Sequence, residues 1–246
     1  MMSSRQSDTD AFYKLLDELG TRLGGPRMLK DCTGSTGWPR YGVYFFFEEG
    51  ECRVNGAPRV VRIGTHALVV RSKHSLWNRL SNHRGNVGGS NPGGGNHRGS
   101  IFREHIGTPL LKSGEWPYEV HKSWRDKNDY QAGRQAEQLL ERAVSGHIGE
   151  MPFLWLEVPD PADRKVIESN SIGILSRRQD GVDAESPEWL GLSADSEKVR
   201  TSALWNVMCV DDDYNPNFLG ILDRLVRRVG KNRLCLNPIQ LCHLNK

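Results

Sequence analysis

The spacing of apolar residues along the chain predicts several amphipathic helices. The clearest lies at residues 8–23, where apolar side chains recur every three to four positions and Gly24-Gly25-Pro26 ends the pattern. Its apolar stripe consists of Phe12, Leu15, Leu16, Leu19 and Leu23. Shorter or weaker patterns of the same period predict further helices at residues 75–83, 99–112, 131–145, 160–176 and 216–229. We therefore expect a chain rich in helices.

Three runs rich in aromatic and β-branched residues predict strands between these helices. They cover residues 41–48, 59–63 and 151–158. A short polar connection at Glu48–Glu51 joins the first two, which predicts a turn and an antiparallel hairpin. Together the elements predict an α+β fold. A small, largely antiparallel sheet would be flanked by helices, with helical additions at the N- and C-terminal ends.

Glycine is concentrated in one stretch that has no apolar periodicity. Residues 84–100 contain seven glycines together with Asn, Ser and one Pro, and they predict a mobile loop because ordering glycine has a high entropic cost. No clean linker divides the chain. We expect an N-terminal helix and approach segment at residues 1–40, a core at residues 41–210 that includes this loop, and a helical extension at residues 211–246.

The composition indicates the broad class of the protein but does not identify its chemistry. The 246 residues are 37% hydrophobic and 26% charged with a net charge of +3, which permits a nucleic-acid partner without requiring one. No apolar run reaches the roughly 18 residues that a membrane span needs, so we expect no membrane association. The absence of an apolar signal segment and the odd count of five cysteines predict reduced thiols in a cytoplasmic protein.

Five separated residue groups follow one another in a characteristic order. Gly42-Val43-Tyr44 lies in the first predicted strand and Arg62-Ile63-Gly64 ends the second. Arg79 and His83 are one turn apart on the next helix, and Glu168 lies on a later helix. This order resembles the GIY-YIG endonuclease family, and within it a restriction-enzyme-like member. The resemblance implies a small antiparallel sheet that presents a tyrosine, and a Mg²⁺-dependent endonuclease in which Mn²⁺ can substitute.

The resemblance also implies a role for each of these residues. Tyr44 would orient or deprotonate the attacking water, Arg79 and His83 would contact the scissile phosphate, and Glu168 would hold the metal. Arg62 stands where the family usually has a second tyrosine, and it would contact phosphate or lower the pKa of Tyr44. The residue types alone leave simpler interpretations open: a solvated helix glutamate, a strand tyrosine packed in the sheet, and a surface arginine beside a satisfied histidine.

Basic residues within and beside the glycine-rich stretch are candidates for contacting the DNA backbone. They are Arg84, His97, Arg98 and Arg103. The expected partner is DNA, the expected setting is restriction or defence, and a homodimer would suit cutting of both strands. Two alternatives stay open: a non-catalytic nucleic-acid-binding module, suggested by Arg62 in the tyrosine position, and a repair-type nicking endonuclease. The asparagine that the family usually carries also has two candidates, Asn170 and Asn206.

Overall fold

A single antiparallel sheet organises the protein. The computed structural model describes residues 4–66, 75–89, 91–125, 135–177 and 183–230, so residues 131–134 and 231–246 of two predicted segments lie outside the described residues. Its four strands run in the order β1-β4-β2-β3. Their bounds are β1 (Arg27–Met28), β2 (Gly42–Cys52), β3 (Pro58–Thr65) and β4 (Pro152–Glu157). Together with the helices, this sheet confirms the predicted α+β class.

The central strand β2 sends alternate side chains into two separate cores. Val43 and Phe45 belong to one hydrophobic cluster, whereas Tyr44 and Phe46 belong to the other, as the period of two along a strand requires. All four side chains are fully buried. The alternation therefore decides which layer of helices each residue of the first triplet faces.

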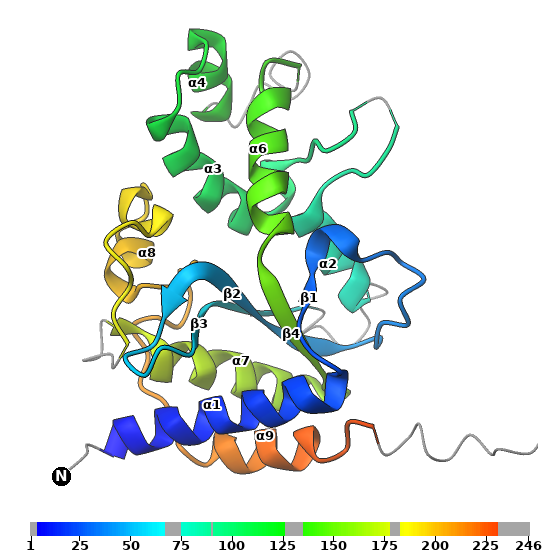
Figure 1. Ribbon diagram of the computed structural model, residues 1–246, viewed down its shortest axis with the longest axis vertical. Coiled ribbons are helices and arrows are strands. Elements are labelled where there is room, and N and C mark those ends of the chain that lie inside the picture. Colours follow the sequence, from blue (N-terminus) through cyan, green and yellow to red (C-terminus); the bar gives the residue numbers. More distant parts are fainter. Residues whose placement is uncertain (1–3, 67–74, 90, 126–134, 178–182, 231–246) are drawn as a thin grey trace, which may run out of the picture.

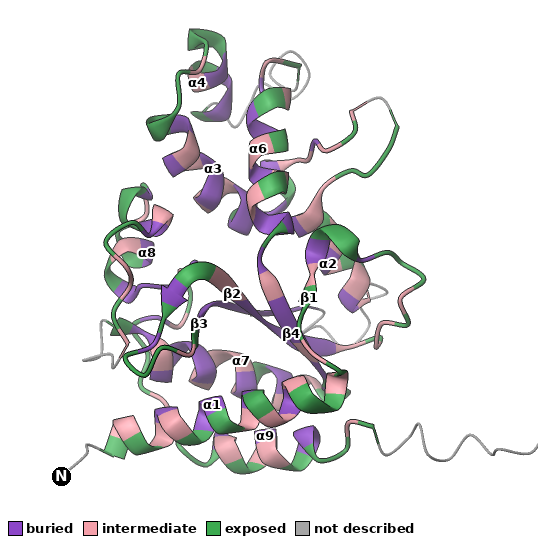
Figure 2. Cartoon of the chain, viewed as in Figure 1, coloured by how far each residue is buried: buried purple, intermediate pink, exposed green. Residues whose placement is uncertain are grey.

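Helices cover both faces of the sheet and form the outer layers (Figure 1). The face of Val43 packs against α1 (Ser4–Leu23), α7 (Pro161–Leu175) and α9 (Phe218–Val226). The face of Tyr44 packs against α2 (Leu76–Arg84), α3 (Ile101–Ser113) and α6 (Gln138–Gly149). The shorter helices α4 (Tyr118–Arg125) and α8 (Glu197–Ser202) add buried residues to the cluster on the face of Tyr44. Figure 2 shows that the middle of the sheet is buried between the layers, whereas the hairpin end of β2 is exposed.

The helices and strands predicted from the apolar pattern are present, with boundaries shifted by a few residues. Local capping explains several of the boundaries. The side chain of Ser75 accepts a hydrogen bond from the backbone of Asn78 at the start of α2, and Asp160 accepts from Ala162 and Asp163 ahead of α7. Because α1 and α9 both pack on the sheet, the described parts of the two ends share the core of the domain. The division at residues 40 and 210 stays a prediction.

The connection of the first hairpin differs from the prediction. A turn was expected at Glu48–Glu51, but β2 continues to Cys52 and the chain turns at residues 53–57. Glu48 and Glu51 are partnered within the fold, whereas Glu49 is exposed. The carboxylate of Glu48 accepts hydrogen bonds from the indoles of Trp189 and Trp205, at 3.0 and 2.9 Å, and Glu51 pairs with Arg59. The polar residues of this segment indicated a turn because the tryptophans that satisfy Glu48 are more than 100 residues away in the sequence.

The described part of the glycine-rich stretch folds back on itself. The backbone N–H of Asn86 donates to Gly94 O at 2.7 Å, and that of Gly93 donates to Asn86 O at 2.9 Å. Gly85 opens the fold-back with φ +81°, where a Cβ atom would lie 2.3 Å from Gly94 O. Only glycine is compatible with both the dihedral angle and the close approach. The mobility of this loop stays a prediction.

Candidate active site

Tyr44 and His83 form a hydrogen-bonded pair between the sheet and α2. The phenol oxygen of Tyr44 lies 2.8 Å from His83 Nε2, and the two rings meet edge to face with centroids 5.6 Å apart. His83 Nδ1 in turn lies 2.8 Å from Ser100 Oγ, at the start of α3. Tyr44, His83 and Ser100 are all buried. The first triplet and the helix histidine therefore meet in space, as the resemblance implies.

The imidazole of His83 is held neutral by its surroundings. Burial lowers its pKa well below the usual value, and the positive charges of Arg79, Arg62 and Arg103 lower it further. A neutral imidazole has one N–H and one acceptor nitrogen. In the tautomer whose Nδ1–H donates to Ser100 Oγ, Nε2 accepts the O–H of Tyr44. The phenol O–H of Tyr44 is then aligned with the acceptor nitrogen of His83.

Gly64 provides the space that the ring of Tyr44 occupies. The two residues are directly opposite each other in the β2–β3 ladder. A Cβ atom at position 64 would lie 2.3 Å from the phenol oxygen and 2.5 Å from the ring carbon that bears it. Because Tyr44 is fully buried, its ring has no room to move aside. The glycine of the second triplet is thus required by the tyrosine of the first.

Arg62 points from β3 into the same buried face as Tyr44. Its guanidinium donates to the backbone carbonyl of Trp205 and lies over the ring of Phe102, 4.5 Å from the centroid. Complete burial lowers the pKa of Arg62, while Tyr44 and Glu168 act in the opposite direction. An arginine with a somewhat lowered pKa is still charged at neutral pH. Arg62 therefore places a fixed positive charge beside the phenol, where the family usually has a second tyrosine.

Glu168 reaches the end of β3 from the helix layer on the other face. One carboxylate oxygen, Oε1, accepts the backbone N–H of Thr65 at 3.0 Å, next to Gly64. Burial raises the pKa of Glu168, and the hydrogen bond from Thr65 and the charges of Arg62 and Arg79 only partly offset that effect. Among the described residues, Oε2 has no hydrogen-bond partner. A half-buried carboxylate with one unpaired oxygen suits a hard divalent cation such as Mg²⁺, which binds one or two carboxylates and retains water.

Arg79 lies one turn before His83 on α2 and is half-buried. Its buried Nε has no hydrogen-bond partner in the part of the chain that the structure describes. Its positive charge acts to lower the pKa of Glu168, Arg62 and His83. A desolvated donor without a partner is costly unless a ligand satisfies it. Nε of Arg62 is unpartnered as well, but Arg62 donates to the Trp205 carbonyl, whereas no donor of Arg79 is engaged by a described residue. The donors of Arg79 are therefore the ones available to an anionic ligand.

Other expected residues occupy different positions. Asn206 hydrogen-bonds the backbone at the edge of β3, next to Arg62. Its Oδ1 accepts from Ile63 N at 3.1 Å, and its Nδ2 donates to Ile63 O at 2.8 Å. Asn170 instead donates to Val166 O within α7. The contributions of Ser100 and of the Trp205 carbonyl were not anticipated. A serine near a glycine-rich loop and a backbone carbonyl give no signal in a sequence.

The four residues expected along the DNA backbone are engaged inside the protein. Arg103 is fully buried and paired with Glu141, so in this conformation it does not agree with the expected contact to phosphate. Buried His97 hydrogen-bonds Glu141, half-buried Arg98 pairs with Glu137, and Arg84 donates to the Cys32 carbonyl. Internal carboxylates and carbonyls satisfy these donors because burial leaves no water to do so. That these residues contact the DNA backbone stays a prediction.

His97, Glu137 and Glu141 form the one group of potential metal-binding side chains found among the described residues. Their ligand atoms lie within 4.8 Å of one another. Arg98 and Arg103 already neutralise the two carboxylates, at 2.7 and 2.5 Å. A divalent ion would add two positive charges to a balanced cluster. The group is better explained as a buried ion-pair network, and the site beside Tyr44 does not include it.

Comparison with known proteins decides the family. The profile of the GIY-YIG domain matches residues 3–232, nearly the whole chain. The protein belongs to the GIY-YIG domain family. No curated protein and no solved structure gives a significant match to the chain. GIY-YIG domains are generally endonucleases that act on DNA and typically use a divalent metal.

Membership agrees with the geometry of the site and leaves its details to be tested. The GIY-YIG tyrosine, the helix arginine and histidine and the later glutamate come from β2, α2 and α7, three elements that meet around β3. Among the described residues, no helix is both long and apolar enough to cross a bilayer. The chain therefore combines a nuclease-family fold with a buried tyrosine–histidine pair.

Proposed function

We propose that this GIY-YIG protein is a Mg²⁺-dependent endonuclease that hydrolyses phosphodiester bonds of DNA. The observation that carries the proposal is the hydrogen bond between Tyr44 and a neutral His83, with the charges of Arg62 and Arg79 beside it. A phenol that can pass its proton to an imidazole is suited to activate water. Adjacent guanidinium groups are suited to hold phosphate oxygens.

The proposed proton path uses two side chains. A water positioned beside Tyr44 attacks phosphorus and gives its proton to the phenol oxygen, while the phenol's own proton moves to Nε2 of His83. The positive charge of Arg62 favours negative charge on the phenol oxygen during the transfer. Ser100 keeps the imidazole in the required orientation through Nδ1.

Arg79 would hold the phosphate, and Glu168 would hold the metal. Arg79 would grip non-bridging phosphate oxygens with the guanidinium donors that lack partners among the described residues. Glu168 would hold the metal through Oε2 while Oε1 keeps its hydrogen bond to Thr65. When bound, Mg²⁺ would reduce the negative charge on the phosphate and stabilise the leaving oxygen, and Mn²⁺ could replace it.

We also propose a biological setting, an oligomeric state and a location. A restriction or defence setting is proposed from the order of the motifs, and a homodimer from the need of such enzymes to cut both strands. A cytoplasmic location is proposed from the odd count of five cysteines, of which Cys32, Cys52 and Cys209 are free thiols in the described residues.

One observation favours a second candidate function. Arg62 replaces the usual second tyrosine and is tied to the Trp205 carbonyl and the Phe102 ring, which is also what a structural arginine would do. A domain that binds nucleic acid without cutting it would retain the fold and the basic residues. Incubation with supercoiled plasmid separates this candidate from a nicking enzyme and from a double-strand endonuclease. The three products are uncut, nicked and linear DNA.

The test is cleavage of supercoiled plasmid by the wild-type protein and by Glu168→Gln, in Mg²⁺, in Mn²⁺ and in EDTA. We expect cleavage by the wild type in either metal and none in EDTA. Glu168→Gln should fold and bind DNA but cut at least 100-fold more slowly, since the amide lacks the charge that holds the metal. Glu119→Gln, an exposed glutamate on α4, is the matched control and should cut normally. Normal cutting by Glu168→Gln would remove the proposed metal site.

A further inference from the structure

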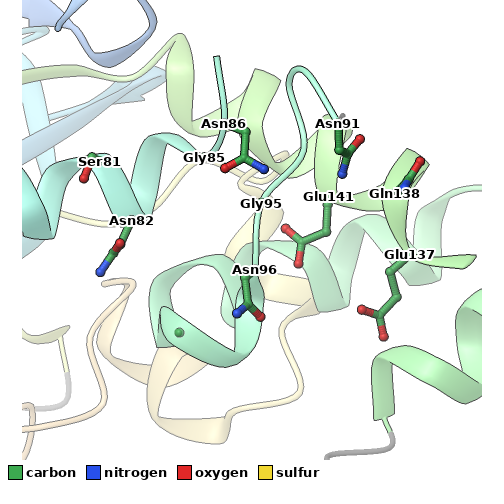
Figure 3. A pocket seen from close by; sticks show the side chains of 11 residues that line it. Ser81, Asn82, Gly85, Asn86, Asn91, Gly95, Asn96, Glu137, Gln138 and Glu141 are labelled. Atoms are coloured by element: carbon green, nitrogen blue, oxygen red, sulfur yellow. The ribbon is translucent and has the colours of Figure 1, made fainter. Parts of the chain in front are cut away.

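A cavity lies beside α2, away from the tyrosine–histidine pair, and Ser81 and Asn82 of that helix line it. It has a volume of about 410 Å³, within the range of roughly 300–1,000 Å³ that is usual for small-ligand sites. Figure 3 shows that it is enclosed by the end of α2, the glycine-rich loop and the start of α6. Asn82, which lines it, directly precedes His83 of the candidate active site. One helix therefore connects the cavity to the tyrosine–histidine pair.

The cavity is built on a rigid floor. Glu137 and Glu141 lie beneath it, and both carboxylates are neutralised by buried or half-buried arginines, Arg98 and Arg103. Gly95, in the wall, packs so closely on Arg103 that a Cβ atom there would lie 2.2 Å from the guanidinium carbon. Any larger residue would push the loop away from this network. The shape of the cavity is thus fixed by the ion pairs under it.

Carboxamides give the cavity its chemical character. Asn82 and Asn86 are exposed and Gln138 is half-buried, and their side-chain amides make no hydrogen bond to any residue that the structure describes. The lining contains no Lys, Arg or aromatic side chain. The arginines beside the lining, Arg98, Arg103 and Arg142, are already engaged with Glu137, Glu141 and Asn91. A phosphate would therefore have to compete for these cations, and an unstacked base would find no ring to stack on. The lining suits a neutral, planar group that is recognised by paired donors and acceptors along its edge.

We propose that this carboxamide pocket reads the edge of an adenine base in the DNA next to the cleavage site. Asn and Gln form two hydrogen bonds with adenine, one accepted from N6 and one donated to N7, and no other base offers that pair in the major groove. The inference rests on the proposed nuclease function for its choice of DNA. It adds that the enzyme prefers certain sequences, and it assigns that preference to Asn82, Asn86 and Gln138.

The test measures base preference separately from cutting. A pool of duplexes with randomised positions is bound to the wild-type protein in EDTA, and the bound fraction is sequenced. The same pool is then cut in Mg²⁺, and the product ends are sequenced. We expect adenine to be enriched at a fixed position by roughly 5- to 100-fold, the range for one paired amide contact. The triple variant Asn82→Ala, Asn86→Ala, Gln138→Ala should bring the enrichment to within about twofold of none.

Two further variants keep the result interpretable. Asn217→Ala removes another exposed carboxamide without a side-chain hydrogen bond, ahead of α9 on the opposite layer, and should leave the enrichment unchanged. Asn86→Asp keeps the shape but replaces the amide donors by a carboxylate, which accepts from N4 of cytosine. It should shift the preference from adenine towards cytosine. This gain of a new preference cannot come from a variant that has merely unfolded.

Each outcome has a distinct meaning. If DNA is cut without base preference, or with one that the triple variant retains, the pocket inference is overturned and the nuclease function stands. If no duplex is cut but amide-dependent adenine enrichment appears in EDTA, the nuclease function fails and the pocket inference stands. If free adenosine binds in an amide-dependent manner while the duplex pool shows no preference, the ligand is a free nucleoside and the DNA reading is overturned.

Discussion

Tyr44→Phe is the change that tests the proposed proton path most directly. It removes one oxygen from a fully buried ring and leaves the ring in place, so it creates almost no cavity. It also leaves Nε2 of His83 without its partner at 2.8 Å. A buried polar atom left unpaired costs about 1–3 kcal/mol. For a chain of this size each kcal/mol lowers Tm by roughly 2–4 °C, so we expect Tm to fall by roughly 2–12 °C.

The effect on cleavage should be much larger than the effect on stability. Without the phenol oxygen no group passes the proton of the attacking water to His83, and positioned acid–base groups contribute about 10²–10⁴-fold to rate. Single-turnover cleavage of a plasmid in Mg²⁺, at a temperature well below both Tm values, measures this loss. Binding to the same DNA in EDTA should be unchanged, because the phenol is not a phosphate ligand in the proposal.

Tyr13→Phe is the matched control for this experiment. Tyr13 is also a buried tyrosine, and its phenol oxygen accepts the backbone N–H of Val60 at 3.1 Å on the opposite face of the sheet. The loss of that bond should destabilise the protein by a similar amount and leave cleavage intact. The proton path is refuted if Tyr44→Phe cuts at the wild-type rate, or if Tyr13→Phe loses as much activity as Tyr44→Phe.

Three other changes probe the same region. Arg79→Lys should cut nearly as poorly as Arg79→Ala in single-turnover assays, because lysine keeps the charge but lacks the planar fork, and near-normal cutting would contradict the clamp role. Gly64→Ala should displace Tyr44 and abolish cleavage, since its Cβ would lie 2.3 Å from the phenol oxygen; Gly220→Ala, which has open space, is the control that should cut normally. Burial lowers the pKa of His105 to about 4, below its value of 6.5 in the unfolded chain, so the unfolded state binds more protons between these values and stability should fall on acidification from pH 6.5 to 4. The loss amounts to up to about 3 kcal/mol, and urea titrations at several pH values should show that His105→Leu reduces it; an unchanged slope would contradict the assignment.

Most of the fold could be predicted from local patterns in the sequence. The stripe of α1, the caps of α2 and α7 and the aromatic run of β2 act over a few residues, so a linear sequence displays them. The turn expected at Glu48–Glu51 was wrong because its glutamates are satisfied by side chains more than 100 residues away, such as Trp189 and Ser186. Burial of charge depends on such distant partners, and a local pattern does not contain them.

The same limit applies to the candidate site. The order of Tyr44, Arg79, His83 and Glu168 is visible in the sequence, and the structure brings their elements together around β3. The internal partners of the loop's basic residues could not be predicted, for a physical reason. A free arginine and an ion-paired one look identical in sequence, and the partner of Arg103 is Glu141, 38 residues later. The carboxamides of the loop give no signal in the sequence because their significance depends on the cavity that they enclose.

The outer edge of β3 is occupied by the protein's own chain. Trp205 N–H donates to Val61 O, the amide of Asn206 pairs with both backbone groups of Ile63, and Glu168 accepts from Thr65 N–H. An edge strand capped in this way offers no row of free donors and acceptors for another strand to join. Two copies of this protein would therefore have to associate through helices or loops if they used this side of the molecule.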